Sequence, residues 1–109
     1  MTEGLYAGLI LGSRYKLIES VGAGGFSVVY RARDLNVDRV VAVKILHEHL
    51  AGDPSLVQRF HREVVKAGKL THESIVFFLD QGEDQGLHYL VMEFLEGQTL
   101  ALFLSLIHI

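Results

Sequence analysis

Apolar residues in the first half of the chain form short stretches that glycine or polar residues separate. Positions 15–21 and 27–33 alternate loosely between apolar and polar side chains, whereas 40–46 is β-branched and almost entirely apolar. Alternation is typical of half-buried strands, and a short continuous apolar stretch is typical of a buried strand. The glycines of 22–25 predict a turn after the first stretch, and the polar residues of 34–39 predict a connection after the second. The pattern therefore predicts three consecutive strands.

The second half of the chain predicts one helix followed by a hairpin. Asp53 is suited to cap a helix that begins at Pro54, and the apolar residues that follow recur at steps of three and four: Leu56, Phe60, Val64, Ala67 and Leu70. Apolar stretches at 75–79 and 87–92 predict two more strands, with a polar turn at 81–86 between them. We expect an α+β fold, in which a five-stranded antiparallel sheet packs against one helix.

Composition and charge narrow the possible classes of function. The chain has 109 residues, of which 50% are hydrophobic and 21% charged, which is typical of one small globular domain. A net charge of −3 without a block of lysine or arginine argues against electrostatic binding of nucleic acid. Cysteine is absent, which excludes disulfides and thiolate metal sites. No apolar stretch reaches the ~20 residues that span a bilayer, and we interpret 1–13 as an N-terminal arm.

Gly22, Gly24 and Gly25 lie between two predicted strands, where they could either cover a phosphate group or form an ordinary hairpin turn. A dinucleotide-binding fingerprint requires a helix directly after the glycines, but a strand-like segment follows here. A P-loop requires Gly-Lys-Ser/Thr at its end, and this chain has none there. Of the glycine motifs for phosphate, only a strand–turn–strand loop fits.

Lys44 stands in the buried third strand, where period-two geometry places it on the face of Ala42 and opposite Val41 and Val43. A buried ammonium group needs an anionic partner, unless its long stem lets the charge reach water. Glu63 in the predicted helix borders the apolar stripe and is the candidate partner. The alternative is a solvated glutamate that pairs locally with Arg59.

These features together resemble the ATP-binding N-lobe of bacterial-type serine/threonine protein kinases. The resemblance rests on Gly-x-Gly-Gly-Phe-Ser-x-Val-Tyr at 22–30, Val-Ala-Val-Lys at 41–44, Arg-Phe-x-x-Glu at 59–63 and Val-Met-Glu-Phe-Leu-Glu-Gly at 91–97. It covers roughly 14–99 and implies a kinase N-lobe at 14–97, with the start of the next helix at 98–109.

The resemblance also assigns roles to individual residues in binding ATP. The glycine-rich loop would cover the phosphates with Gly22, Ala23, Gly24, Gly25, Phe26 and Ser27, the last standing where the family has a third glycine. The adenine would lie among Val21, Val29, Ala42, the gatekeeper Met92 and the backbone of Glu93 and Leu95. Lys44 would contact the α- and β-phosphates and pair with Glu63, and these two are the expected catalytic residues.

The catalytic aspartates of the family are not in this sequence, which contains neither His-Arg-Asp nor Asp-Phe-Gly. The ligands for Mg²⁺ would therefore lie in a C-terminal lobe outside this chain, and no metal site is predicted within it. We expect an inactive fragment whose parent transfers the γ-phosphate of ATP to serine or threonine of a protein substrate. The kinase domain would be cytoplasmic, and membrane association would require a span elsewhere in the parent.

Two alternatives remain open from the sequence. The chain could belong to a non-catalytic nucleotide-binding or scaffold module, or it could be a small interaction domain without a nucleotide site. A separate expectation concerns 104–109, which matches the in-frame translation of a sequencing-adapter sequence, so we expect these residues to be adapter-derived. The alternative for them is a genuine apolar start to the next helix.

Overall fold

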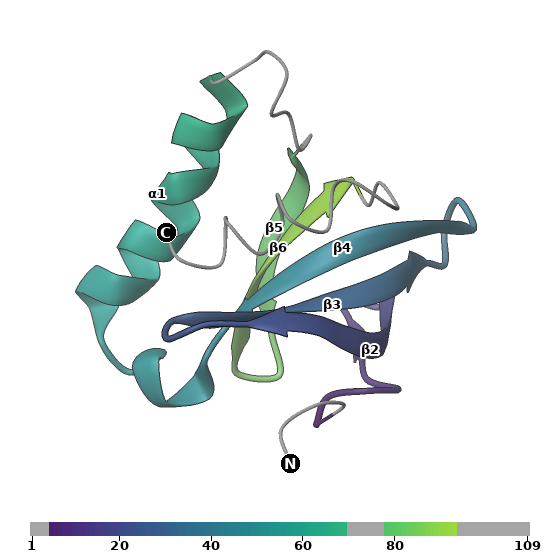
Figure 1. Ribbon diagram of the computed structural model, residues 1–109, viewed down its shortest axis with the longest axis horizontal. Coiled ribbons are helices and arrows are strands. Elements are labelled where there is room, and N and C mark those ends of the chain that lie inside the picture. The colour runs from purple at the N-terminus through teal and green to yellow at the C-terminus, as the bar shows by residue number, and fades with distance from the viewer. Residues whose placement is uncertain (1–4, 70–77, 94–109) are drawn as a thin grey trace.

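The computed structural model describes residues 5–69 and 78–93, with residues 63–69 described by their backbone (Figure 1). The elements in chain order are β1 (Ile10–Leu11), β2 (Tyr15–Ala23), β3 (Ser27–Asp34), β4 (Arg39–Leu46), a 3-10 helix (Glu48–Leu50), α1 (Pro54–Lys69), β5 (Phe78–Asp84) and β6 (Leu87–Glu93). The predictions at 70–77 and 94–109 lie outside the described residues, and they include Leu70, Leu95 and the expectation that 104–109 is adapter-derived.

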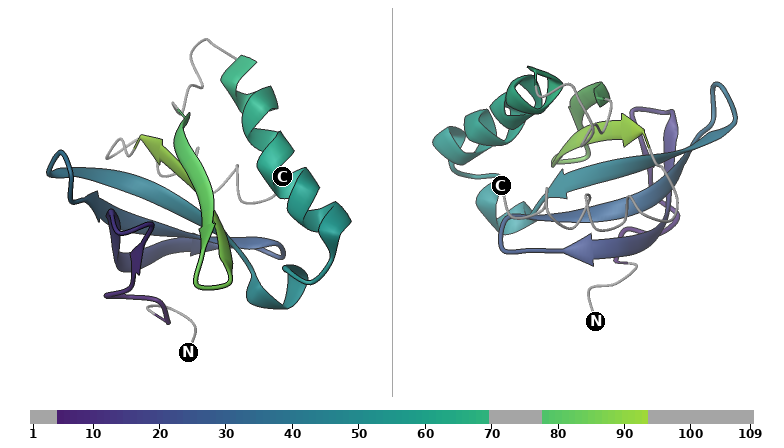
Figure 2. Two further views of the ribbon diagram at one scale, coloured as in Figure 1. Left: turned by 180° about the vertical axis from the view of Figure 1, so that it is seen from behind. Right: turned by 45° about the horizontal axis from the view of Figure 1, so that its top comes forward.

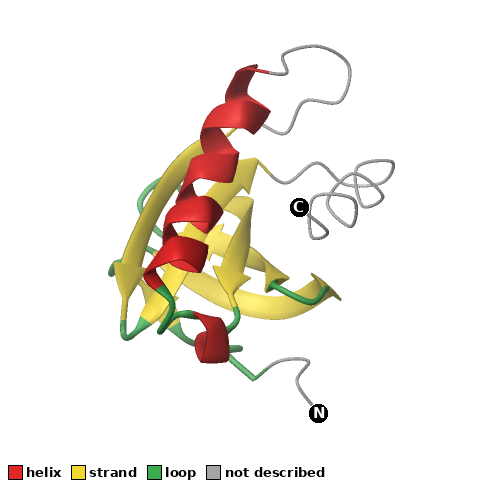
Figure 3. Cartoon of the chain, turned by 90° about the vertical axis from the view of Figure 1, so that its left-hand side faces the viewer, coloured by secondary structure: helices red, strands yellow, loops and turns green. Residues whose placement is uncertain are grey.

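The strands form one antiparallel sheet in the order β1-β2-β3-β4-β6-β5, and α1 lies across one face of it (Figures 1 and 3). This arrangement confirms the α+β fold and the single packed helix. The sheet has six strands where the sequence predicted five, because Ile10 and Leu11 of the arm pair with Lys16 and Tyr15. The arm is therefore the first edge of the sheet.

The hairpin at the other edge of the sheet corrects one prediction. Residues 80–84 continue β5, and the turn consists of Gln85 and Gly86, which both have positive φ as a tight hairpin requires. The sequence placed a polar turn at 81–86, because an edge strand with mostly exposed side chains carries the same polar residues as a loop. The described part of this strand begins at Phe78.

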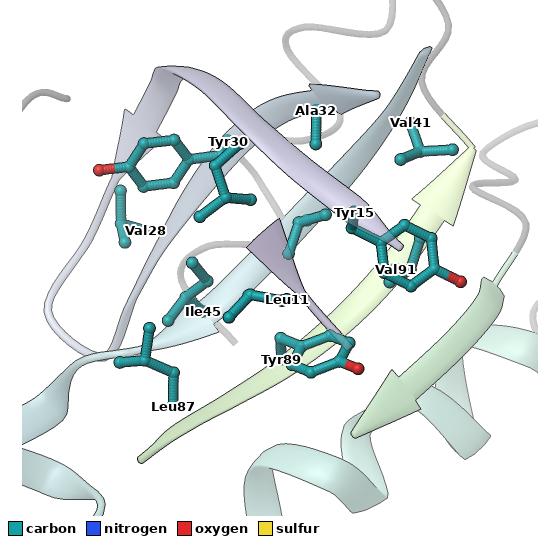
Figure 4. Close-up of a cluster of buried hydrophobic side chains, with 12 residues drawn as sticks. Leu11, Tyr15, Val28, Tyr30, Ala32, Val41, Ile45, Leu87, Tyr89 and Val91 are labelled. Atoms are coloured by element: carbon teal, nitrogen blue, oxygen red, sulfur yellow. The ribbon is translucent and has the colours of Figure 1, made fainter. Parts of the chain in front are cut away.

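Most core side chains lie on the face of the sheet that points away from α1 (Figure 4). Val41, Val43 and Ile45 of β4 belong to this cluster together with residues of all the other strands except β5. Tyr15 and Tyr89 meet edge to face within it, with ring centroids 6.1 Å apart. Burial of these aliphatic and aromatic groups is the main contribution to the stability of the sheet.

The N-terminal arm, drawn in purple in Figure 2, also contacts the hairpin at the other edge of the sheet through hydrogen bonds. The Gly12 amide donates to Asp84 Oδ2 at 2.7 Å, and the Gln85 side-chain amide donates to the Ile10 carbonyl at 2.9 Å. Leu11 is completely buried as a result of this wrapping. The two edges of the sheet are thus joined through side-chain hydrogen bonds, and the sheet curls toward a barrel.

The start of α1 matches the sequence. Asp53 Oδ1 accepts hydrogen bonds from the amides of Ser55 (2.9 Å) and Leu56 (3.4 Å), which confirms Asp53 as the N-cap. Phe60 on the inner face of α1 is 6% exposed and packs with Leu46 and Leu90 of the sheet. This small second cluster sets the distance between the helix and the strand that carries Lys44.

Candidate functional site

The site predicted from the sequence is organised by the register of four adjacent strands. Lys44 of β4 pairs with Val29 of β3 on one side and with Leu90 of β6 on the other, and Val29 pairs in turn with Gly22 of β2. Residues directly opposite in an antiparallel pair point to the same face of the sheet. Gly22 near the end of β2, Val29 of β3 and Lys44 of β4 therefore lie in one row across the sheet.

A second row, directly beside the first, contains the remaining apolar candidates. Ala42 pairs with Met92 across β4 and β6, and both are buried, with exposed fractions of 0% and 7%. Val29 is 1% exposed, and Val21 is half-buried near the end of β2. The strand pattern thus confirms that Ala42 and Lys44 share a face. The structure brings Val29, Ala42 and Met92 together on that same face.

Lys44 is 4% exposed, so its charge does not reach water in the way that one alternative proposed. Its Nζ lies 5.9 Å from the centroid of the Phe60 ring, within range of a cation–π interaction. Phe60 belongs to α1, and Glu63 follows it by three positions, almost one helical turn. The side chain of Glu63 lies outside the described part of the chain, so its pairing with Lys44 stays a prediction.

The glycine-rich loop differs in detail from the sequence expectation. β2 continues through Gly22 to Ala23, and the chain turns over 24–26, where the Gly24 amide donates to the Ser27 carbonyl at 2.8 Å. Within the described part of the chain, glycines with positive φ are Gly8, Gly12 and Gly86, so this loop does not use that conformation. A Cβ on Gly25 would meet no atom within 4 Å, and Phe26 is 42% exposed. The tip of the loop therefore lies open.

Ser27 is the first residue of β3 and is completely buried, yet its Oγ has no hydrogen-bond partner among the described residues. An unsatisfied buried hydroxyl costs about 1–3 kcal/mol. A buried hydroxyl without a partner calls for an explanation, and a bound ligand that accepts from it would be one. A phosphate oxygen close to the loop would be a suitable acceptor.

His47, for which the sequence predicts no role, lies against the glycine-rich loop in the structure. Its amide donates to the Phe26 carbonyl at 2.9 Å, and its ring Nε2 lies 2.8 Å from the Gly24 carbonyl oxygen, so the ring nitrogen donates. The pairing of Ser27 with Leu46 brings the next residue of the chain to the loop. Only the strand register could have predicted this contact, because His47 resembles an ordinary loop histidine in the sequence.

Glu93, the last residue of β6, contributes its side chain to an ion pair with Arg39 at 3.2 Å. The adenine contact expected from Glu93 uses its backbone, which this ion pair leaves unaffected. Leu95, the second expected backbone contact, lies outside the described residues. Where the structure describes side chains, no cluster of three or more metal-ligating residues occurs. None of the described helices is long and apolar enough to cross a bilayer.

The chain is similar to known proteins in both sequence and fold. Residues 15–108 match the family model described as "Protein kinase domain". The chain is 48% identical over 94 residues to the serine/threonine-protein kinase PknB of Mycobacterium tuberculosis, covering 83% of this chain and 15% of PknB. It is 40% identical over 95 residues to the serine/threonine-protein kinase PrkC of Bacillus subtilis, covering 87% of this chain and 15% of PrkC.

Solved structures give the same result for the fold. The kinase domain of PknI from Mycobacterium tuberculosis superposes with a TM-score of 0.65 at 26% identity, covering 84% of this chain and 36% of that domain. The apo form of PpkA-294 superposes with a TM-score of 0.68 at 22% identity, over 84% of this chain and 38% of that structure. Both matches confirm that the sheet and its helix have the arrangement found in kinase domains.

Proposed function

Because this chain belongs to the protein kinase family, we propose that it forms the ATP-binding part of a serine/threonine protein kinase. The observation that carries the proposal is the buried Lys44, which lies in one row with Gly22 and Val29 and faces α1. A buried cation next to an open glycine-rich loop is suited to hold the phosphates of a nucleotide. The matched relatives are named as kinases, which favours this function over a non-catalytic scaffold.

Each group would act through simple chemistry. Val29, Ala42 and Met92 would supply an apolar surface for a flat adenine, and because they are at most 7% exposed the site would have to open before adenine could pack on them. The ammonium group of Lys44 would neutralise charge on the α- and β-phosphates, and Glu63 on α1 would orient that ammonium. The hydroxyl of Ser27 could donate to a phosphate oxygen once the tip of the loop shifts to admit the ligand.

Phosphoryl transfer itself is proposed for a longer protein. The chain spans about 15% of the length of the relatives it matches, and its sequence contains neither His-Arg-Asp nor Asp-Phe-Gly. Groups outside the described residues would have to hold Mg²⁺, which would supply positive charge to balance the charge that develops on the phosphates during transfer. We propose that the longer protein phosphorylates serine or threonine of a protein substrate and that its kinase domain is cytoplasmic.

The direct test is nucleotide binding by Lys44→Met, measured by isothermal titration with Mg²⁺-ATP. Removal of a charge-assisted contact should weaken binding by about ten- to a hundredfold. The matched control is Lys16→Met, which removes an exposed lysine from β2 and should bind as the original chain does. Both variants should retain the original circular dichroism spectrum, because methionine fills the space of the lysine stem.

Two results would overturn the proposal. If Lys44→Met binds Mg²⁺-ATP as tightly as the original chain, the lysine does not hold the phosphates. If the original chain itself shows no binding at millimolar nucleotide, the domain has no nucleotide site of its own and an interaction domain becomes the better interpretation. Phosphotransfer by the longer protein should be lost with the same substitution.

A further inference from the structure

A chain of polar side chains connects α1 to the β5–β6 hairpin beside Phe60. His61 Nδ1 lies 2.8 Å from the side-chain oxygen of Gln81, and His61 Nε2 lies 3.1 Å from Nδ1 of His88. The other ring nitrogen of His88 faces a carboxylate oxygen of Glu83 at 3.7 Å. Gln81 and Glu83 belong to β5 and His88 belongs to β6, so one histidine of the helix contacts both strands of the hairpin.

The geometry determines where the protons lie. The amide oxygen of Gln81 can only accept, so His61 carries its proton on Nδ1 and offers the lone pair of Nε2. His88 therefore donates from its Nδ1 to His61. A proton on His88 Nε2 is also accommodated, because that nitrogen faces the carboxylate of Glu83. The network is complete when His88 is charged and His61 is neutral.

A second proton cannot be accommodated in the same way. Protonation of His61 Nε2 would direct its N–H group at the N–H group of His88 Nδ1, with 3.1 Å between the two nitrogens. It would also place two positive charges on rings whose centroids are 5.2 Å apart. The neighbouring charges add to this cost: exposed Arg62 follows His61 on α1, and Lys44 of β4 lies beneath Phe60. Glu83 of β5 faces His88 and not His61, while Asp80 of the same strand accepts from Tyr15.

The position of His61 on α1 links its contact with the hairpin to the part of the helix that lies over Lys44. Its neighbour Phe60 stacks against it edge to face and covers Lys44, and Glu63 follows by two positions. Among the side chains that the structure describes, Phe60 and Val57 of α1 pack against Leu46 and Leu90 of the sheet. A change at His61 is therefore transmitted to the segment of α1 that faces the lysine.

We propose that His61 and His88 are positioning residues whose hydrogen bond holds α1 against the β5–β6 hairpin and is released when His61 takes up a proton. The contact is present at neutral pH and is lost on acidification. Its effect on the approach of Glu63 to Lys44 rests on the proposed nucleotide function, whereas the contact between helix and hairpin does not. No nucleotide is needed to test it.

The experiment compares amide hydrogen exchange in the full chain at about pH 7.5 and about pH 5, the range in which imidazole titrates. Protection factors of α1 amides, referenced to those of β4, should fall by about tenfold on acidification, as expected for one lost hydrogen bond and one new like-charge pair. His88→Gln replaces the second ring with an amide that can either donate to His61 Nε2 or accept from it, so a proton on His61 no longer meets a fixed N–H group and α1 protection should not change with pH. His49→Gln removes an exposed histidine outside the network and should behave as the original chain does.

If the protection of α1 in the original chain does not depend on pH, the proposal is overturned. It is also overturned if His88→Gln loses as much α1 protection on acidification as the original chain does. Should His88→Gln fail to fold, ring ¹⁵N spectra of the original chain decide the question. At neutral pH they should show His61 protonated on Nδ1 and unprotonated on Nε2, and the opposite tautomer would overturn the proposal. Since nucleotide is absent from every measurement, a negative result leaves the proposal for ATP binding untouched.

Discussion

His47 and Gly24 are joined by a hydrogen bond of 2.8 Å between the ring Nε2 and the carbonyl oxygen, across the opening of the glycine-rich loop. The first residue after β4 thereby holds the end of β2. Because the same strand carries Lys44, the position of the loop is tied directly to the position of the lysine. A loop that is already held in place loses less conformational entropy when it closes over phosphates.

Replacement of His47 by alanine should weaken binding of Mg²⁺-ATP by about fivefold, the equivalent of one ordinary hydrogen bond. The fold should be retained, because the backbone bond from the His47 amide to the Phe26 carbonyl does not depend on the side chain. Isothermal titration measures the effect, with Lys16→Met of β2 as the control, because the ring of His49 stacks on that of His47 and His49 is therefore not independent of the contact. Equal affinities of His47→Ala and the original chain would show that the ring contact does not position the loop.

The buried carboxylate of Asp34 should make the domain sensitive to acid. Arg14 donates to both of its oxygens at 2.9 Å, and this contact, helped by the backbone amide of Asn36, lowers the pKa of Asp34 below its usual value. A carboxyl whose pKa is lower in the folded state stabilises the fold above its ordinary pKa, and this contribution is lost as the pH falls through the folded-state pKa.

Urea unfolding followed by circular dichroism measures this effect. We expect Asp34→Asn to lower the free energy of unfolding at neutral pH by about 2 kcal/mol and to reduce its decline toward acid. Asp38→Asn removes an exposed carboxylate that pairs with Arg33 and should change stability by less than about 0.5 kcal/mol. Identical acid sensitivity of the original chain and Asp34→Asn would contradict the assignment.

Tyr15 should make the domain sensitive to alkali. Burial raises the pKa of its hydroxyl, and so does the hydrogen bond that it donates to Asp80 Oδ2 at 2.7 Å. Stability from a group whose pKa is raised is complete below its ordinary value, about 10 for tyrosine, and is lost at higher pH. Tyr15→Phe should cost about 1–2 kcal/mol near neutral pH and should show a weaker alkaline decline in stability. A decline that is unchanged in Tyr15→Phe would refute this role.

Gly82 of β5 leaves space for the hydroxyl end of Tyr89. A Cβ at this position would lie 2.8 Å from the hydroxyl oxygen and 3.0 Å from Cζ of that ring, which is 5% exposed and packed in the core. Gly82→Ala should therefore lower stability by about 1–3 kcal/mol in urea unfolding. Gly52→Ala, where a Cβ meets no atom within 4 Å, is the matched control and should be nearly neutral. Combination with Tyr89→Phe should recover part of the loss.

The sequence was sufficient for features that depend on local pattern. The alternation in β4 placed Lys44 opposite Val41 and Val43, and Asp53 marked the start of α1 correctly. Features that depend on pairing between distant segments were missed. The polar residues of β5 were interpreted as a turn, since a strand at the edge of a sheet carries no apolar alternation. The contacts of His47 and His61 follow from register and helix placement, which single residues do not reveal.

The hydrogen bond from Gly12 to Asp84 joins residues that are 72 positions apart in the sequence. During synthesis the arm leaves the ribosome well before its partners in the β5–β6 hairpin, which follow it in the sequence. Leu11 is completely buried in the folded domain, and it therefore stays exposed to solvent until the hairpin has formed. Closing so long a loop is slow, so β1, which precedes the other described strands in the sequence, is secured only after the hairpin has formed.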